Sequence, residues 1–173
     1  MSNRPLALTL CLALVAVSAA AEPEAKEEKR PRPDPKLTPG QVVRIVMDAL
    51  KKNDAKDSGI AVTFDFASPA NQKITGPLER FIPMVKGPVY GPMVNHKSAE
   101  YGKALLLGDE QTAAAVVVTL VDGNGETAVY LFTLSKQEEG DLKDCWMTDG
   151  VIRVKPGDDP EKILKEPPGK ERA

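Results

Sequence analysis

His96 is the one histidine of the chain, and it is the first residue to consider for catalysis. An imidazole titrates close to neutral pH, which makes His96 a candidate general base. The residues directly beside it include no carboxylate that would orient the ring. Acids that would have to meet it in space are Asp65, Glu79 and Asp149. Because a base needs a placed partner and a pocket, the simpler interpretation is a structural, hydrogen-bonded histidine.

Cysteine chemistry is the second option. Cys11 lies in an N-terminal apolar segment that is expected to be removed, which leaves Cys145 alone in the mature chain. A lone cysteine forms no internal disulfide, and free cysteine is among the most buried residue types. A nucleophilic role with His96 would need a thiolate beside a base, and nothing in the sequence places the two together. We therefore expect Cys145 to be buried.

Three further residues are candidates for lining a ligand pocket together with His96. Tyr90 lies in the stiff loop Lys-Gly-Pro-Val-Tyr-Gly-Pro, where it would act as a lid or simply rest on the surface. Trp146 would line the pocket, although buried aromatic residues belong to the core by default. Asp149 would anchor a polar group of the ligand, or would bond its own backbone in a turn before Gly150.

Composition argues against metal sites and nucleic-acid binding. The common zinc sites need several His and Cys ligands together, and the mature chain has one of each. Asp122 and Asn124 have the start of a calcium-loop spacing, but Thr127 and Thr133 stand where the required Gly and Glu would be. The formal net charge of −2 provides no basic surface for nucleic acid. We expect no metal and no cofactor.

The first 21 residues have the pattern of a secretory signal peptide. Residues 1–4 carry one positive charge, and residues 6–17 form an apolar run that is too short for a comfortable membrane span. Small residues follow and fit a cleavage site after Ala21. We expect export to the periplasm or the cell exterior, and no stable membrane insertion after cleavage.

The mature chain is predicted to hold one folded domain between two tails. Residues 22–36 contain four prolines and balanced charges with almost nothing to bury, which predicts a disordered charged linker. Residues 156–173 have the same character and are predicted to form a disordered tail. The folded part, residues 37–155, is long enough for one hydrophobic core.

A capping box opens this domain. Thr38 stands at the N-cap position, and Gln41 follows three residues later, so that each side chain can bond the other's backbone amide. Apolar residues then repeat on one helical face until polar residues take over near Asn53. The pattern predicts a helix that begins at Thr38 and ends near Asn53.

Two segments that follow are less regular. Residues 60–67 alternate like a strand, yet they also suit a helical face, and periodicity leaves both structures open. Residues 76–85 predict a short helix with one apolar face. Pro83 should bend or stop this helix, because proline has no backbone N–H to donate.

Strand patterns fill the second half of the domain. The predicted strands cover residues 94–101, 103–107, 112–121, 127–135, 142–148 and 151–154. The two longest are joined by Asp-Gly-Asn-Gly, a strong hairpin turn. Helices followed by a strand meander predict an α+β fold, with N-terminal helices packed on an antiparallel sheet of about four to six strands.

Segments spread over nearly the whole core carry a family resemblance. They are Leu37-Thr38-Pro39 with Val42-Val43-Arg44, Phe66-Ala67-Ser68-Pro69-Ala70-Asn71, Thr75-Gly76-Pro77-Leu78-Glu79-Arg80-Phe81 with Met84-Val85, His96-Lys97-Ser98-Ala99-Glu100, and Cys145-Trp146-Met147-Thr148-Asp149-Gly150. These segments resemble a family of small proteins known only as a domain of unknown function. The resemblance implies that the Phe66 segment is helical.

The order of helices and strands resembles the nuclear-transport-factor-like fold, also called ketosteroid-isomerase-like. This resemblance implies a strongly curved, cone-like sheet, with Trp146 in the core on a final strand. Members of that fold include isomerases, dehydratases, hydrolases and non-catalytic binders, so the fold does not select a function. No acidic residue here aligns with the isomerase pattern, and no catalytic residue is carried over.

Three functions remain open at this point. The leading hypothesis is a non-catalytic exported binding module for a small apolar molecule or a protein partner, because the fold type makes a pocket and the chain lacks a convincing catalytic set. The enzyme alternative is an isomerase- or hydrolase-like activity that uses His96 with an acidic residue. The third is a homodimeric interaction protein, because both faces of residues 113–121 are apolar and the face away from the helices needs a cover.

Overall fold

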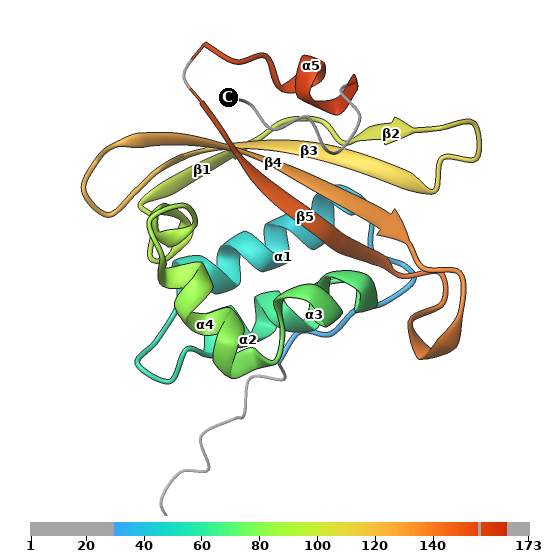
Figure 1. Ribbon diagram of the computed structural model, residues 1–173, viewed down its shortest axis with the longest axis horizontal. Coiled ribbons are helices and arrows are strands. Elements are labelled where there is room, and N and C mark those ends of the chain that lie inside the picture. The colour runs from blue at the N-terminus through green and yellow to red at the C-terminus, as the bar shows by residue number, and fades with distance from the viewer. Residues whose placement is uncertain (1–29, 156, 166–173) are drawn as a thin grey trace, which may run out of the picture.

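The computed structural model describes residues 30–155 and 157–165. The predicted signal peptide, the start of the predicted linker (residues 22–29) and residues 166–173 lie outside the described residues. Within the described part, four α-helices precede an antiparallel sheet and a fifth follows it (Figure 1). This α+β fold with the helices first confirms the fold class expected from the sequence.

The helices before the sheet are α1 (Pro39–Lys51), α2 (Ser58–Asp65), α3 (Pro69–Thr75) and α4 (Leu78–Lys86). The strands are β1 (Ser98–Tyr101), β2 (Leu105–Leu107), β3 (Ala113–Val121), β4 (Thr127–Lys136) and β5 (Trp146–Val154). The remaining described elements are two short 3-10 helices, η1 (Gly91–Met93) and η2 (Gly140–Leu142), and the last helix, α5 (Pro160–Lys165).

Helix α1 begins at the predicted capping box. The backbone N–H of Thr38 donates to Gln41 Oε1 at 2.8 Å, and the backbone N–H of Gln41 donates to Thr38 Oγ1 at 3.3 Å. Two amides that have no partner within the helix are satisfied in this way. The helix ends at Lys51, close to the predicted end, and buries one apolar face in the core.

The ambiguous residues 60–67 lie largely in helix α2. Asn53, two residues after the end of α1, accepts the backbone N–H of Ile60 on its Oδ1 at 3.1 Å. Gly59 allows a close crossing of the two helices, since a Cβ at this position would collide with the backbone carbonyl of Ala49. Contact with α1 therefore selects the helix, which periodicity alone left open.

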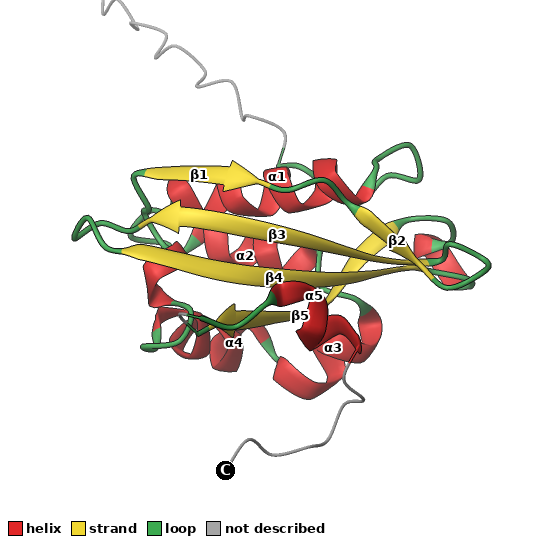
Figure 2. Ribbon diagram, turned by 90° about the horizontal axis from the view of Figure 1, so that it is seen from above, coloured by secondary structure: helices red, strands yellow, loops and turns green. Residues whose placement is uncertain are grey.

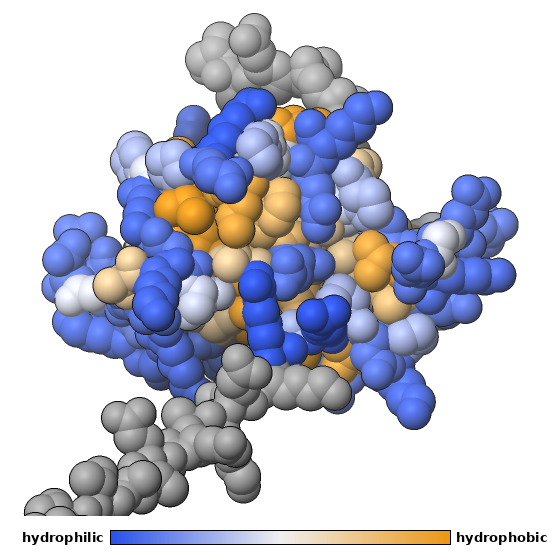
Figure 3. Space-filling view, turned by 90° about the horizontal axis from the view of Figure 1, so that it is seen from below, coloured by the Kyte–Doolittle hydropathy of each residue, from blue (hydrophilic) through white to orange (hydrophobic). Residues whose placement is uncertain are grey.

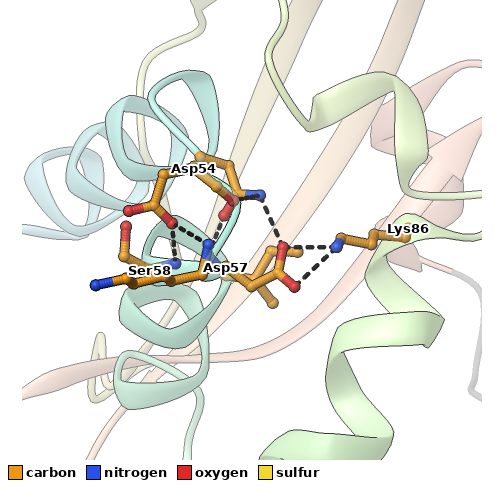
Figure 4. Close-up of polar contacts among 7 residues, drawn as sticks. Asp54, Asp57, Ser58 and Lys86 are labelled. Carbon is orange, nitrogen blue, oxygen red and sulfur yellow. Dashed lines mark hydrogen bonds and ion pairs between the residues drawn. The ribbon is translucent and has the colours of Figure 1, made fainter.

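Polar contacts hold the junction of α1, α2 and α4 (Figure 4). Asp54 Oδ1 accepts the backbone N–H groups of Lys56 at 2.9 Å and of Ser58 at 3.0 Å. The two carboxylate oxygens of Asp57 lie 2.7 and 2.8 Å from Lys86 Nζ. The bond from Lys86 is the largest cause of a lowered pKa of Asp57. The turn between α1 and α2 is thus tied to the end of α4.

The sheet is antiparallel, in the order β1-β3-β4-β5, and β2 also pairs with β3. Strands β3 and β4 pair along their length, from Ala113 opposite Ser135 to Val121 opposite Thr127. Helices α1 to α4 lie on one side of the curved sheet and α5 lies on the other (Figure 1). Figure 2 shows the same sheet from above, with β3 and β4 running through its centre.

Strand β5 is a single bulged strand, although the sequence predicts two runs separated by a turn. Thr133 pairs with Gly150 and Leu134 pairs with Thr148, which leaves Asp149 without an opposite residue on β4. One extra residue on one strand is a β-bulge, which bends the strand and re-aims nearby side chains. The Asp-Gly pair is a bulge here because β4 supplies ladder partners on both sides of it.

Helix α5 lies within residues 156–173, for which the sequence predicts a disordered tail. Ile163 and Leu164 of this helix pack on the outer face of the sheet, on a cluster that includes Ala115 and Leu131. Two adjacent aliphatic residues in a charged segment are too few to predict a helix. The apolar outer face of the sheet supplies the surface that these two residues bury.

The described end of the predicted linker, residues 30–36, contacts the domain. Arg30 forms an ion pair with Asp65 of α2, with 2.8 Å between Arg30 Nη2 and Asp65 Oδ2. Asp34 accepts the backbone N–H of Lys36 on Oδ1 at 2.8 Å. A low apolar content predicts disorder here, whereas a turn and a surface ion pair position these residues against the helices.

Candidate functional site

A cavity of about 310 Å³ opens between helices α3 and α4 and strands β4 and β5. Buried apolar side chains from α1, α4, η1 and β4 form much of its wall. They are Val46, Leu50, Phe81, Val85, Met93 and Phe132. The volume lies at the lower end of the range of about 300–1,000 Å³ that small-molecule sites occupy.

Two exposed apolar side chains also line the cavity. Ile74 of α3 is 71% exposed, and Met84 of α4 is 37% exposed. Figure 3 shows the helical face of the molecule, where apolar surface gathers in a patch bordered by hydrophilic side chains. Exposed apolar residues that are gathered in this way mark interaction sites, whereas scattered ones do not.

Neutral polar groups complete the lining. Asn71 Nδ2 donates to the backbone carbonyl of Thr148 at 3.1 Å, and Thr75 Oγ1 donates to the carbonyl of Asn71 at 2.9 Å. Thr63 Oγ1 donates to the carbonyl of Gly59 at 3.0 Å. Thr148 is only 6% exposed, and its Oγ1 has no hydrogen-bond partner among the described residues.

Asp149 is the one residue with a carboxylate side chain among the described residues that line the cavity. The bulge in β5 places it there, and its Oδ1 accepts a hydrogen bond from Ser135 Oγ of β4 at 2.9 Å. The predicted turn, in which Asp149 bonds its own backbone before Gly150, is replaced by this contact. A side chain on a paired strand can reach its neighbour strand, so the local turn pattern does not form.

Tyr90 lines the cavity from the loop between α4 and β1. Its hydroxyl donates to the carbonyl of Val151 on β5 at 3.2 Å. Two backbone carbonyls of the loop accept hydrogen bonds from side chains of the sheet. Tyr130 Oη donates to Val89 at 2.8 Å, and Arg153 Nη1 donates to Pro88 at 3.1 Å. Burial raises the pKa of Tyr130 to about 12, so this donor keeps its proton. The loop is therefore attached to the sheet at three points.

His96 is 3% exposed and is not among the residues that line the cavity. Its Nδ1 lies 2.9 Å from the carbonyl oxygen of Met93, so the ring donates from Nδ1 to this carbonyl. Burial is the main cause of a lowered pKa of His96, and the bond to Met93 opposes this shift. Within the described chain, no carboxylate is hydrogen-bonded to the ring.

Trp146 and Cys145 lie at the start of β5. Trp146 belongs to the main core, where it is 9% exposed, and it is outside the lining of the cavity. Cys145 is free and buried, which confirms the expected burial. Burial raises the pKa of the Cys145 thiol and so disfavours the reactive thiolate. Of the four predicted pocket residues, Tyr90 and Asp149 line the cavity, and His96 and Trp146 do not.

Residues 30–155 and 157–165 contain no group of three or more His, Cys, Asp or Glu side chains placed to hold a metal ion. None of the helices described there has the length and apolar character that a membrane crossing requires. The described lining of the cavity offers apolar contact and hydrogen bonds.

A family model described as Domain of unknown function (DUF4864) matches residues 34–159. The chain belongs to this family. The match reaches from just before α1 to just before α5, so the DUF4864 region includes the whole sheet and the cavity. No curated protein and no solved structure matches the chain.

Within the DUF4864 region, Thr148 and Asn71 are site residues that sequence reasoning missed. Both lie in segments that carry the family resemblance, and these segments meet in space. The backbone N–H of Ser68 donates to the carbonyl of Thr148 at 2.8 Å, and the N–H of Thr148 donates to the carbonyl of Phe66 at 2.9 Å. Neutral side chains give no charge or spacing signal, so only the resemblance itself pointed to these segments.

Proposed function

We propose that this domain is a non-catalytic binding module for a small, mostly apolar molecule. The observation that carries the proposal is the cavity between α3, α4 and β5, which joins a buried apolar wall to the exposed residues Ile74 and Met84. Covering apolar surface gains about 25 cal/mol per Å², so an apolar ligand is favoured there. Because His96 is outside the lining, the geometry supports binding over acid–base catalysis.

Native mass spectrometry of residues 22–173, purified from the compartment to which the chain is exported, tests this function. We expect the observed mass to exceed that of the protomer by the mass of one small molecule. The second measurement is an NMR titration with the hydrocarbon 2-isopropylnaphthalene, in which the amides of the cavity lining should shift. A clean protomer mass together with unshifted amides would contradict the proposal.

A substitution at the exposed side of the cavity gives a matched comparison. Ile74→Glu places a charge where the ligand enters, and we expect it to weaken binding of 2-isopropylnaphthalene roughly tenfold, because the charge must lose water. Leu106→Glu is the control, since Leu106 of β2 is 48% exposed and does not line the cavity. Equal affinities of the two variants would assign the binding to another surface.

The proposed fold relationship is to the nuclear-transport-factor-like group, in which helices and a strongly curved sheet enclose a cone. The helices-first order and a cavity on the helical side of the sheet support this relationship. An experimental structure of the domain, superposed on members of that group, tests it. Agreement in strand order and in the position of the cavity is expected, and a different strand order would count against it.

We propose that the chain is exported and binds its ligand outside the cytoplasm. The signal-peptide pattern of residues 1–21 supports export. Expression of the full chain in a bacterial host, followed by N-terminal sequencing of the periplasmic product, is the direct test. The first residue of that product should be Glu22. An uncleaved chain that stays in the cytoplasm would contradict export.

A further inference from the structure

One hydroxyl group of the cavity differs from the other hydroxyls that line it. The hydroxyls of four other lining residues each donate to a backbone carbonyl, at distances between 2.9 and 3.3 Å. These four residues are Thr63, Thr75, Tyr90 and Thr133. Thr148 Oγ1 is buried and has no hydrogen-bond partner among the described residues. A buried hydroxyl without a partner is destabilising, so it points to a group that binds there.

Strand β5 holds Thr148 in a defined position. Its partner on β4 is Leu134 of the main core, and paired residues share a face of the sheet, so the Thr148 side chain faces the helices. The backbone of Thr148 is bonded to Phe66, Ser68 and Asn71, at 2.9, 2.8 and 3.1 Å. Because strand and helical segments both hold this backbone, the hydroxyl is preorganised for a ligand.

The charges around the cavity favour a neutral ligand. Among the described residues that line it, there is no lysine, arginine or histidine. Asp149 also lines the cavity, and its carboxylate, which is bonded to Ser135 Oγ, provides no positive charge for an anion. A charged ligand would lose its hydration on entry and meet no opposite charge, whereas a neutral oxygen needs only one donor.

We infer that the Thr148 hydroxyl is the polar anchor of the cavity, and that the ligand is a neutral, mostly apolar molecule with one carbonyl oxygen. Thr148 Oγ1 donates its proton to that oxygen, and the apolar body of the ligand lies against the wall and against Ile74 and Met84. A carbonyl fits because it accepts without bringing a further donor that the cavity would leave unpaired. This inference rests on the proposed binding function and adds the ligand class.

Three probes that share one ring system test the inference. They are the ketone 2-acetylnaphthalene, the hydrocarbon 2-isopropylnaphthalene and the carboxylate 2-naphthoate. Their dissociation constants are measured by NMR titration of residues 22–173, for the natural chain and for Thr148→Val and Thr148→Ser. Thr148→Val keeps the shape and removes the hydroxyl, and Thr148→Ser keeps the hydroxyl. Far-UV circular dichroism is the control that checks whether each variant is folded.

We expect the natural chain to prefer the ketone to the hydrocarbon by roughly threefold to tenfold, which is the effect of one neutral hydrogen bond. Thr148→Val should lose this preference and bind the hydrocarbon as the natural chain does. Thr148→Ser should keep the preference for the ketone. The carboxylate should bind most weakly to all three chains.

The outcomes separate this inference from the function on which it rests. If the natural chain binds the ketone and the hydrocarbon equally, the anchor is overturned and the apolar site stands. If the carboxylate binds most tightly, the neutral ligand class is overturned. If no probe shifts the amides of the cavity lining, the proposed binding function itself is overturned.

Discussion

Burial decides the chemistry of the few reactive residues in this domain. It lowers the pKa of His96 and raises the pKa of Cys145, so each is held in its neutral form. Neither residue lines the cavity. Among the described lining residues, the buried side-chain polar atom without a hydrogen-bond partner is Thr148 Oγ1, which has no charge. These residue-scale features support the proposed binding function, in which shape and hydrogen bonding select the ligand.

The buried ring of His96 makes stability depend on pH. Because the pKa of His96 is lower in the folded chain than in the unfolded chain, the neutral ring contributes stability above a pH of about 6.5, which is lost as the pH falls through the folded-state pKa. Lys51 and Asp48 act on the ring in opposite directions. We expect the free energy of unfolding, from urea denaturation, to fall as the pH decreases from about 7.5 to 5.

His96→Gln is the comparison for this prediction, because glutamine takes up no proton in this pH range. Disturbing the contact with Met93 should lower the stability of the variant by about 1 kcal/mol at neutral pH. Its dependence on pH should be weaker than that of the natural chain. An equally strong dependence would assign the effect to other groups whose pKa is lowered in the folded chain, such as Asp57, which is hydrogen-bonded to Lys86.

Between elements, the close packing of α1 and α2 shapes the helical layer that walls the cavity. Gly59 of α2 lies against the backbone of Ala49 in α1. Asn53 links the two helices: its backbone N–H donates to the carbonyl of Leu50 in α1 at 3.2 Å, while its Oδ1 accepts from Ile60 and its Nδ2 donates to Asp57 at 3.0 Å, at the start of α2. A segment whose periodicity suits two structures becomes a helix here because α1 provides both a contact surface and a hydrogen-bond partner.

Gly59→Ala tests this crossing. The added Cβ would collide with the carbonyl of Ala49, and since this carbonyl is part of the α1 backbone and cannot turn aside, the helices must separate. We expect a loss of roughly 2–3 kcal/mol in the free energy of unfolding, measured by chemical denaturation. Gly40→Ala in α1 is the control, because nothing lies within 4 Å of a Cβ added there. The control should gain about 0.5–1 kcal/mol from helix propensity, and equal effects at both positions would contradict the close crossing.

For the whole molecule, the sheet is a layer with a cover on each side (Figure 1). Helices α1 and α4 cover one face of the sheet, where the main core lies. Helix α5 covers part of the opposite face of the sheet. The homodimer hypothesis started from an outer face that needs a cover. Because Ile163 and Leu164 supply some of that cover from within the chain, a partner would have to bind beside α5 or replace it. Homodimerisation stays a prediction.

The double substitution Ile163→Asp and Leu164→Asp removes the cover supplied by α5. Each partly buried aliphatic side chain contributes about 1 kcal/mol, so the free energy of unfolding should fall by roughly 2 kcal/mol. Light scattering should show more self-association, because the apolar outer face is uncovered. Lys162→Asp changes an exposed position of the same helix and serves as the control. A double variant that behaves like this control would show that α5 does not stabilise the sheet.

The sequence by itself determined those features whose signals lie within a few residues of each other. The capping box of Thr38 and Gln41 marks the start of α1, and the Asp-Gly-Asn-Gly turn joins β3 to β4. The carboxylate of Asp122 accepts the backbone N–H groups of Asn124 and Glu126, at 2.8 and 2.9 Å, as expected of a hairpin turn. Local capping and turn chemistry, together with the order of periodic segments, was sufficient for the α+β class.

Only the tertiary structure decided the features that depend on which distant segments meet. The cavity is lined by residues from α1 through β5. The Thr148 hydroxyl, which has no partner in residues 30–155 and 157–165, is placed by backbone contacts with Ser68 and Asn71. The bulge at Asp149 depends on pairing with β4, and α5 depends on an apolar sheet face to cover. Sequence periodicity reports local backbone geometry, whereas a cavity is formed by packing between elements, which no local pattern contains.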